Sequence, residues 1–315
     1  MQTKAMKKIA LLVNPAAAGG RAIRRVPAVM DQLRGAGIEV IALTGTDARD
    51  ALRLATGAVR GGIDALVAAG GDGSVNLAVQ AIGDSGTSLG IIPLGTGNDN
   101  ARSFGLPLGD VAAATKVIID GATRQVDVAV AVTDEGVRRR FTGVLSAGFD
   151  SAVNERANDM TFPPGRAKYL AAIIAQLATF RPVEYHVTLD SEEIVDHGML
   201  VAVGNGPAYG GGMLVCPAAD VADGRLHITF LHKVGRPTFL GVLPKVFSGK
   251  HVHHPSVTVH TSGSVRIVAD GQLAYADGER IGPLPVQISL LPGALRVLVP
   301  DSQGLPPLDS PPASI

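Results

Sequence analysis

The sequence predicts an α/β protein with an N-terminal open parallel α/β domain and a C-terminal domain that is mainly antiparallel β. Up to residue 120, short continuous apolar runs alternate with helical segments of 10–15 residues, which is typical of a parallel sheet flanked by helices. From Arg124 onward the apolar segments are short, β-branched and often alternating, as in antiparallel strands. The length of 315 residues also favours two domains.

In the first domain, continuous apolar runs predict buried parallel strands, and amphipathic segments between them predict helices. The expected strands are 8–13, 38–43, 65–69 and 88–92, and the expected helices are 22–35, 47–59, 74–82 and 110–120. Three of these strands stop at loops rich in glycine and small polar residues. In sheets of this kind, ligands bind at the carboxyl ends of the strands, so we expect these loops to meet there.

In the second domain, short β-branched segments predict strands with two helices between them. The expected strands are 125–132, 140–147, 183–189, 199–205, 226–232, 257–259, 265–269 and 286–290, and the expected helices are 165–180 and 238–247. We therefore assign residues 1–125 to the first domain and 126–293 to the second, with the strand in 294–300 returning to the first. Residues 301–315, rich in Pro, Ser and Asp, are expected to form a disordered tail.

Composition excludes several classes of protein. Lys+Arg and Asp+Glu both total 28, which argues against a nucleic-acid binder with a broad basic surface. The single cysteine, Cys216, cannot form an internal disulfide, so a reducing cytoplasm fits, and we expect a small core residue there. The longest mostly apolar helical segment, 169–180, is far shorter than the ~20 residues of a membrane span. We expect a soluble protein that visits the membrane if it acts on lipid.

The most informative stretch is Ala65–Ala81, where an apolar strand runs through Gly70-Gly71-Asp72-Gly73 directly into a helix. Such a junction presents free backbone N–H groups and the positive end of the helix dipole, which together bind phosphate. A carboxylate beside phosphate requires a cation between them, so Asp72 indicates Mg²⁺ as well. Neither the dinucleotide-binding fingerprint nor the P-loop motif is present, and an ordinary strand–helix turn is the alternative.

Two further strand-end loops and three motifs of the second domain carry possible chemistry. The strand ends lead into Asn14-Pro15 with small residues up to Gly20, and into the run from Pro93 to Arg102. The later motifs are Gly204-Asn205-Gly206 with Gly210–Gly212, the turn with Asp220, Asp223 and Gly224, and Asp277-Gly278-Glu279. Carboxylates in these turns can bind a divalent cation or act as a general base, and plain turns are the alternative. The cluster His251, His253 and His254 matches no zinc spacing, and neither Ser74 nor Ser146 has a nucleophilic triad around it.

Taken together, these motifs resemble the diacylglycerol kinase catalytic-domain family, and within it the bacterial lipid kinases. The segment 70–76 resembles the family's Gly-Gly-Asp-Gly-Thr signature with Ser74 for Thr, and 93–99 with Ala101-Arg102 is similar to a further hallmark. The loop 14–20, the glycine and Asp223 motifs and Asp277-Gly278-Glu279 continue the resemblance in order over residues 8–300. The chain departs from the family pattern at Ala16–Ala18, where a serine is usual, and at Ala222, where an Asp often stands.

The resemblance implies an ATP- and Mg²⁺-dependent kinase that phosphorylates a lipid hydroxyl, with a diacylglycerol-like acceptor and a phosphatidic-acid-like product. The implied nucleotide-binding residues are Asn14, Pro15, Gly19, Gly20, Thr44, Gly70, Gly71, Asp72, Gly73, Ser74, Asn76, Gly95, Thr96, Gly97, Asn98 and Asp99. Asp72 would hold Mg²⁺, and either Glu279 or Asp277 would take the proton from the acceptor. Asp223, with the carbonyls of Asp220 and Arg225, would form a second, structural Mg²⁺ site.

Two rival functions remain open at this point. The NAD kinases resemble this chain at Gly-Gly-Asp-Gly, although the loop 93–99 and the Asp277–Glu279 motif favour a lipid kinase. A non-catalytic nucleotide-binding regulator is the rival from another class, and it would not need Asp72, Asp277 and Glu279 together. The expected partners are a lipid with a free hydroxyl and, transiently, the cytoplasmic membrane surface, with no nucleic acid. The identity of the lipid stays open, and so does the oligomeric state, for which a homodimer is one of the options.

Overall fold

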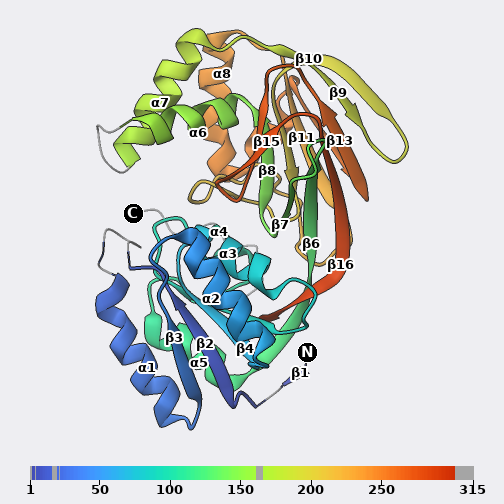
Figure 1. The fold of residues 1–315 in the computed structure, drawn as a ribbon. Helices are drawn as coiled ribbons and strands as arrows, with labels where there is room; N and C mark the ends of the chain where they lie inside the picture. The colour runs from blue at the N-terminus through green and yellow to red at the C-terminus, as the bar shows by residue number, and fades with distance from the viewer. Residues whose placement is uncertain (1, 4, 16–19, 21, 161–165, 302–315) are drawn as a thin grey trace. The chain divides into compact units, whose positions relative to one another are not determined.

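The computed structural model describes residues 2–3, 5–15, 20, 22–160 and 166–301, and it divides the chain into two compact units. Unit 1 comprises Met1–Val128 and Pro292–Ile315, and unit 2 comprises Ala129–Leu291. Two long strands, β6 (Ala122–Thr133) and β16 (Val286–Leu298), carry the chain from one unit into the other (Figure 1). The sequence analysis places these two boundaries at residues 125 and 293, and the structure places them after Val128 and Leu291.

Unit 1 is built on a parallel sheet in the order β5-β4-β2-β3, with the last residues of β16 beside β5. Its strands are β1 (Gln2–Thr3), β2 (Lys8–Val13), β3 (Glu39–Leu43), β4 (Ala65–Gly70) and β5 (Ser88–Pro93). Its helices are the 3₁₀ helix η2 (Ala22–Arg25), α1 (Val26–Gly35), α2 (Ala48–Arg60), α3 (Asp72–Ile82), α4 (Asp99–Ser103) and α5 (Val111–Asp120). α1 contacts α5, and α2 contacts α3, so the sheet has helices on both faces, as the sequence predicts (Figure 1).

Local chemistry explains these elements. All six residues of β4 are buried, as expected for an inner strand of a parallel sheet covered on both faces. α2 begins where the Asp47 carboxylate accepts a hydrogen bond from the Asp50 amide, and α5 begins in the same way at Asp110. α5 ends at Gly121, whose left-handed backbone closes the helix without a Cβ clash.

Unit 2 is an antiparallel β structure with helices on its outside. One run of strands has the order β15-β14-β8-β10-β9-β13-β16; β11 pairs with β10, β12 pairs with β11, and β7 pairs with β6. Its strands are β7 (Arg138–Phe141), β8 (Val144–Gly148), β9 (Val183–Thr188), β10 (Glu193–Gly204), β11 (Leu226–His232), β12 (Val257–Ser262), β13 (Ser264–Val268), β14 (Leu273–Ala276) and β15 (Glu279–Pro283). Its helices are α6 (Phe149–Asp159), α7 (Arg166–Thr179), α8 (Arg236–Val242) and the 3₁₀ helices η3 (Leu243–Ser248) and η4 (Lys250–His253).

The core of unit 2 consists of the inward-facing residues of these strands. Tyr185 of β9 and Phe230 of β11 are completely buried, with their ring centroids 5.7 Å apart in an edge-to-face arrangement. Cys216 is buried as predicted, and burial raises the pKa of its thiol to about 11, so it behaves as a small core residue. The fold class inferred from the sequence is confirmed.

Several element predictions were wrong. α6 was not predicted, because its sequence is largely polar and has no apolar periodicity that would identify a helix. The helix expected at 74–82 begins two residues earlier, with Gly71 as its N-cap. The helix expected at 238–247 is α8 followed by η3, since Pro244 cannot donate the backbone hydrogen bond that would continue α8. The strand expected at 286–290 and the strand expected within 294–300 are the single strand β16.

The predicted tail lies almost entirely in residues 302–315, which are outside the described part of the chain. Within the described residues, every helix is too short or too polar to cross a lipid bilayer.

Candidate active site

The carboxyl ends of the unit 1 strands gather the loops that the sequence singles out. The chain leaves β2 toward β3, but it leaves β4 in the opposite direction, toward β5. The loops that follow the adjacent strands β2 and β4 therefore diverge to opposite faces, and in parallel sheets a switch in strand order of this kind is where ligands bind. Asn14 and Gly70 stand at the ends of these two strands, and Thr44 follows β3 at the same edge.

Backbone contact between two glycine loops shapes this edge. A Cβ on Gly95 would lie 2.5 Å from the Cα of Gly71, and a Cβ on Gly71 would lie 3.2 Å from the Cα of Gly95. A Cβ on Gly70 would lie 2.1 Å from the Ser74 hydroxyl. Only glycine allows these close approaches, and the same absence of side chains leaves the backbone open to a ligand.

The loop after β5 is held by its own polar side chains. Asn98 has a left-handed backbone, with φ at 56°, and its amide exchanges two hydrogen bonds with Gly95, at 3.0 Å from the Gly95 N–H and 2.9 Å to the Gly95 carbonyl. The guanidinium of Arg102 donates to the Asp99 carboxylate at 2.6 Å and to the Gly97 carbonyl at 3.3 Å. Asn98 and Asp99 therefore build the loop from within, and Thr96 is exposed at its tip.

Asp72 and Ser74 lie at the start of α3, beside this pair of loops. One carboxylate oxygen of Asp72, Oδ1, accepts hydrogen bonds from the backbone N–H and side-chain amide of Asn100, at 3.0 and 3.4 Å. Among the described residues, Oδ2 of Asp72 has no hydrogen-bond partner, and neither does the buried Ser74 hydroxyl. An anchored carboxylate with one oxygen left over, in a loop of bare backbone, fits Mg²⁺ and phosphate.

The remaining predicted nucleotide residues are distributed around the same edge. Asn14 and Pro15 are exposed directly after β2, and Thr44 is exposed after β3. Gly20 has a φ of 81°, whereas Gly19 and the departures Ala16–Ala18 lie outside the described residues. Asn76 is buried within α3, and its side-chain oxygen accepts a hydrogen bond from Gln80 at 3.3 Å, so it contributes to packing of the helix.

In unit 2, the hairpin of β14 and β15 carries the predicted catalytic carboxylates and distinguishes between them. Asp277 lies in its turn with φ at 50°, and its carboxylate accepts three backbone hydrogen bonds, from Thr142 at 3.2 Å, Gly143 at 3.0 Å and Val144 at 3.2 Å. A Cβ on Gly143 would lie 2.4 Å from Oδ1 of Asp277, so only glycine permits this approach. The Asp277 carboxylate thus fastens the hairpin to the start of β8.

Glu279 has the opposite environment. It is the first residue of β15 and is exposed, and its carboxylate makes no hydrogen bond or ion pair with any described residue. Its carboxylate therefore projects from an anchored turn with its oxygens available. The sequence left the roles of these two residues open, and the structure separates them by environment: the Asp277 carboxylate is bonded to backbone N–H groups, and the Glu279 carboxylate is exposed.

The predicted second magnesium turn is already satisfied by protein groups. The carboxylate of Asp223 accepts from the Arg225 N–H at 2.9 Å through Oδ1 and lies 2.7 Å from Nε2 of His227 through Oδ2. Oδ1 of Asp220 accepts from the Ala222 N–H at 3.0 Å. A cation bound to Asp223 would share its carboxylate with the Arg225 N–H and His227, and within the described residues no three metal-ligating side chains gather. The site stays a prediction.

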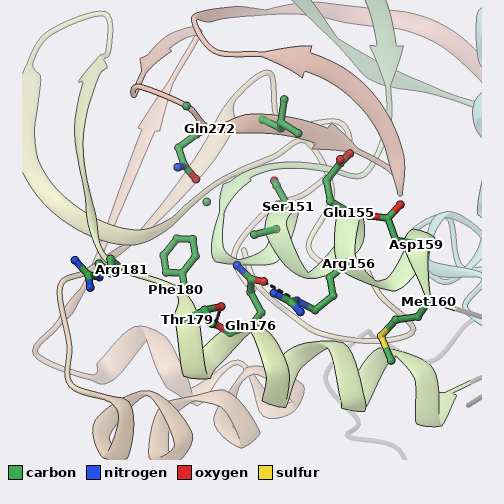
Figure 2. A pocket seen from close by; sticks show the side chains of 14 residues that line it. Ser151, Glu155, Arg156, Asp159, Met160, Gln176, Thr179, Phe180, Arg181 and Gln272 are labelled. Atoms are coloured by element: carbon green, nitrogen blue, oxygen red, sulfur yellow. Dashed lines mark hydrogen bonds between the residues drawn. The ribbon is translucent and has the colours of Figure 1, made fainter. Parts of the chain in front are cut away.

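A cavity of about 700 Å³, lined by both polar and apolar side chains, lies beside the β14–β15 hairpin, between α6, α7 and the turn that precedes β14 (Figure 2). Figure 2 shows Arg156 of α6 donating to the Gln176 side chain of α7, at 2.9 Å. On the same helix, Glu155 accepts a hydrogen bond from the Tyr275 hydroxyl of β14 and pairs with Arg280 at 3.2 Å. α6 is therefore tied to the hairpin on both sides of Asp277.

Sequence reasoning missed Glu155 and the whole of α6. The sequence carries one signal, namely the glycine Gly148 at the end of the strand β8. The structure shows why glycine is required there: its φ is 113°, and a Cβ would lie 2.3 Å from the Tyr185 hydroxyl. A strand that ends at a required glycine and runs directly into a polar segment repeats the pattern of Gly70–Asp72.

A second cavity of unit 2 is narrow and apolar. It holds about 60 Å³ and is lined chiefly by aliphatic and aromatic side chains of α6, α8, η3 and the neighbouring strands, among them Phe149, Leu231, Phe239, Val242 and Val246. Asp150, Thr229 and His251 add polar groups to this wall. Nε2 of His251 lies 3.1 Å from the Val215 carbonyl, and its buried Nδ1 has no hydrogen-bond partner within the described chain. Burial lowers the pKa of His251, so the ring is neutral at pH 7.

Comparison with known proteins places the chain in a family. Residues 8–131 match the diacylglycerol kinase catalytic domain, and residues 143–299 match the YegS C-terminal NAD kinase beta sandwich-like domain. A diacylglycerol kinase of Mycobacterium tuberculosis (strain ATCC 25618 / H37Rv) is 41% identical over 294 residues, covering 93% of this chain and 95% of that protein. A diacylglycerol kinase of Bacillus subtilis (strain 168) is 27% identical, covering 94% and 97%.

Solved structures agree on the fold. A candidate diacylglycerol kinase from Bacillus anthracis str. Sterne superposes with a TM-score of 0.78 at 24% identity, covering 95% of this chain and 97% of that one. An NAD kinase from Archaeoglobus fulgidus in complex with ATP superposes with a TM-score of 0.51 at 9% identity, covering 93% and 92%. Because both domain matches occur in order and a relative 41% identical spans nearly the whole chain, this protein belongs to the diacylglycerol kinase family of lipid kinases.

Proposed function

We propose that this protein transfers the γ-phosphoryl group of ATP to the hydroxyl of a diacylglycerol-like lipid, with Mg²⁺, and releases a phosphatidic-acid-like product and ADP. One observation carries the proposal. The exposed Glu279 carboxylate stands on a hairpin that Asp277 fastens to the backbone of β8 through three hydrogen bonds. A purely nucleotide-binding protein has no need for a carboxylate presented in this way.

In unit 1, the nucleotide would lie at the carboxyl edge of the sheet. The backbone N–H groups at the start of α3, together with the bare loop of Gly70, Gly71 and Gly95, would hold its phosphates. Mg²⁺ bound there would neutralise charge that develops on the phosphate oxygens. Oδ2 of Asp72 would hold the ion, while Asn100 keeps the carboxylate oriented through Oδ1.

In unit 2, Glu279 would act as the general base. The lipid oxygen attacks the γ-phosphorus, the bond from the γ-phosphorus to the bridging oxygen of ADP breaks, and Glu279 takes the proton of the hydroxyl. Asp277 would hold the turn in position and take no part in proton transfer, because both of its oxygens accept backbone N–H groups. Positioning and charge neutralisation would supply most of the catalysis.

The apolar cavity beneath α8 and η3 is the proposed site for an acyl chain. Its walls are chiefly apolar, as a hydrocarbon chain requires, but its 60 Å³ accommodates only a short length of chain. Binding a whole acyl chain therefore requires α8 and η3 to move away from the strands. The unpartnered Nδ1 of His251 would favour a lipid that carries a hydrogen-bond donor in this part of its chain.

The test is the transfer of labelled γ-phosphate from ATP, with Mg²⁺, to single lipids in mixed micelles, with NAD in a parallel reaction. The panel comprises diacylglycerol, a sphingoid base, ceramide and phosphatidylglycerol. Label in diacylglycerol supports the proposal and label in another lipid replaces the acceptor. Label in NAD alone identifies an NAD kinase, and ATP binding without label in any acceptor indicates a regulator.

Two variants separate the base from a general effect of charge. Glu279→Gln is expected to lower turnover by about 10²–10⁴-fold with nearly unchanged nucleotide affinity. Glu135→Gln removes a carboxylate that is also exposed, from the β6–β7 turn, and is expected to leave turnover unchanged. Near-normal turnover of Glu279→Gln would remove Glu279 from the mechanism.

A further inference from the structure

One segment of unit 2 differs in charge from the rest of the chain. Between Asp223 and Asp270 the sequence contains no Asp or Glu, although the whole protein has equal numbers of acidic and basic residues. The middle of this segment, 233–250, forms α8, η3 and the start of η4. It carries four exposed cationic side chains, Lys233, Arg236, Lys245 and Lys250. The segment is therefore a local positive patch on a protein of zero net charge.

The same segment exposes two large apolar side chains. Leu240 of α8 is 53% exposed, and Phe247 of η3 is 58% exposed, the largest value among the exposed large hydrophobic residues of the described chain. Fully exposing a leucine or phenylalanine forgoes burial that is worth about 1.5–3 kcal/mol. We name the six residues Lys233, Arg236, Leu240, Lys245, Phe247 and Lys250 the α8–η3 surface.

The opposite side of these short helices is apolar as well. Phe239 and Val242 of α8 and Leu243 and Val246 of η3 face inward and line the narrow apolar cavity. A surface helix of a water-soluble domain normally keeps its outer side polar. Here apolar side chains occupy both sides, and every formally charged side chain of the segment 233–250 is a cation.

We propose that the α8–η3 surface docks on a lipid bilayer that contains anionic headgroups. Leu240 and Phe247 insert into the boundary between headgroups and acyl chains, while the four cations contact the negative lipids around them. Charge complementarity favours this partner, because the surface has four cationic side chains that attract anionic headgroups and no acidic residue that would repel them. The inference rests on the proposed function only in that a lipid kinase must reach a membrane.

The position of the surface gives docking a second consequence. The helices that would lie on the bilayer are the ones whose inner side closes the apolar cavity. Because insertion pulls α8 and η3 outward, docking and opening of the cavity become the same movement. A lipid chain then passes from the bilayer to an apolar wall without crossing water.

The first experiment measures binding of the full chain to sedimented vesicles of phosphatidylcholine with and without 30% phosphatidylglycerol, in the absence of ATP. Each cation near an anionic surface contributes about fivefold to partitioning, so Lys245→Gln with Lys250→Gln is expected to weaken binding about 25-fold. Leu240→Gln and Phe247→Gln are each expected to weaken it about tenfold. The control is Val195→Gln, which replaces an equally exposed side chain, at 53%, beside Asp196.

The second experiment compares phosphorylation of the same acceptor in anionic vesicles and as a monomeric short-chain lipid. The four substitutions are expected to lower turnover on vesicles in proportion to binding and to leave turnover on the monomeric lipid within twofold. Binding to vesicles by a protein that phosphorylates no lipid would support the docking surface and reject the proposed function. Unchanged vesicle binding in all three variants of the α8–η3 surface overturns the inference, as does a shift of oligomeric state in size-exclusion chromatography, which would identify the surface as a contact between copies of the chain.

Discussion

Asp277 is the residue at which the structure makes the sharpest quantitative prediction, namely that its carboxylate stabilises unit 2 and takes no proton from the substrate. In Asp277→Ala, the N–H groups of Thr142, Gly143 and Val144 lose their acceptor. Each unsatisfied donor costs about 1–3 kcal/mol, and the lengths of 3.0–3.2 Å place these bonds toward the low end. Alanine also tolerates the φ of 50° less well than Asp, by about 1 kcal/mol. We therefore expect a loss of about 4–5 kcal/mol in the free energy of unfolding.

The assay follows unfolding of unit 2 in urea by tyrosine fluorescence. The chain has no tryptophan, and all four tyrosines lie within residues 129–291, so the signal reports this unit alone. Asp277→Asn keeps one acceptor oxygen and the tolerance for a left-handed backbone, so a loss of about 1–2 kcal/mol is expected. The matched control, Glu279→Gln, should change stability by less than about 0.5 kcal/mol. The assigned roles would be refuted if Asp277→Ala were as stable as the wild type. They would also be refuted if Asp277→Ala and Glu279→Gln lowered the free energy of unfolding equally.

Three further predictions concern stability and pH. Gly95→Ala places a Cβ 2.5 Å from the Cα of Gly71, so it is expected to destabilise unit 1 by more than about 2 kcal/mol and to weaken ATP binding, both measured by calorimetry. The control Gly35→Ala, whose Cβ would have nothing within 4 Å, should stabilise α1 slightly, and equal effects of the two substitutions would contradict the close contact. Burial lowers the pKa of His251 below its usual 6.5, so the unfolded chain binds the proton more readily than the folded one. The unfolding free energy of the wild type should therefore fall as pH drops below about 6.5. In urea titrations, His251→Leu should not show the decrease in unfolding free energy that His251 causes. The pKa of Asp190 is lowered below its usual 3.8 by a hydrogen bond from the Gly263 N–H and by further hydrogen bonds with Ser264 and Ser262. Asp190→Asn should therefore be less stable than the wild type at neutral pH, and the difference in unfolding free energy should vanish as pH falls through the lowered pKa. A difference that persists in acid would reject the charge-based explanation.

Much of unit 1 is readable from the sequence because its signals are local. The buried strand 65–69, the glycines at 70 and 71 and the helix after them are consecutive, and strands that alternate with helices admit very few arrangements. The position of Asn14, Thr44, Gly70 and Thr96 at one sheet edge follows from parallel pairing alone. The family resemblance rests on the same short motifs and is confirmed by the comparisons.

What required the tertiary structure depends on residues far apart in the chain. Asp277 meets Gly143 across 134 positions, and no local pattern shows that its carboxylate is consumed by backbone N–H groups while that of Glu279, two residues later, is available. Glu155 meets Tyr275 across 120 positions in the same way. The sequence by itself determined the fold class, the family and the loops that can hold phosphate, since hydrophobic period and glycine spacing are local properties. Only the folded chain decided which carboxylate anchors and which is presented, because hydrogen-bond partners and burial are set by long-range packing.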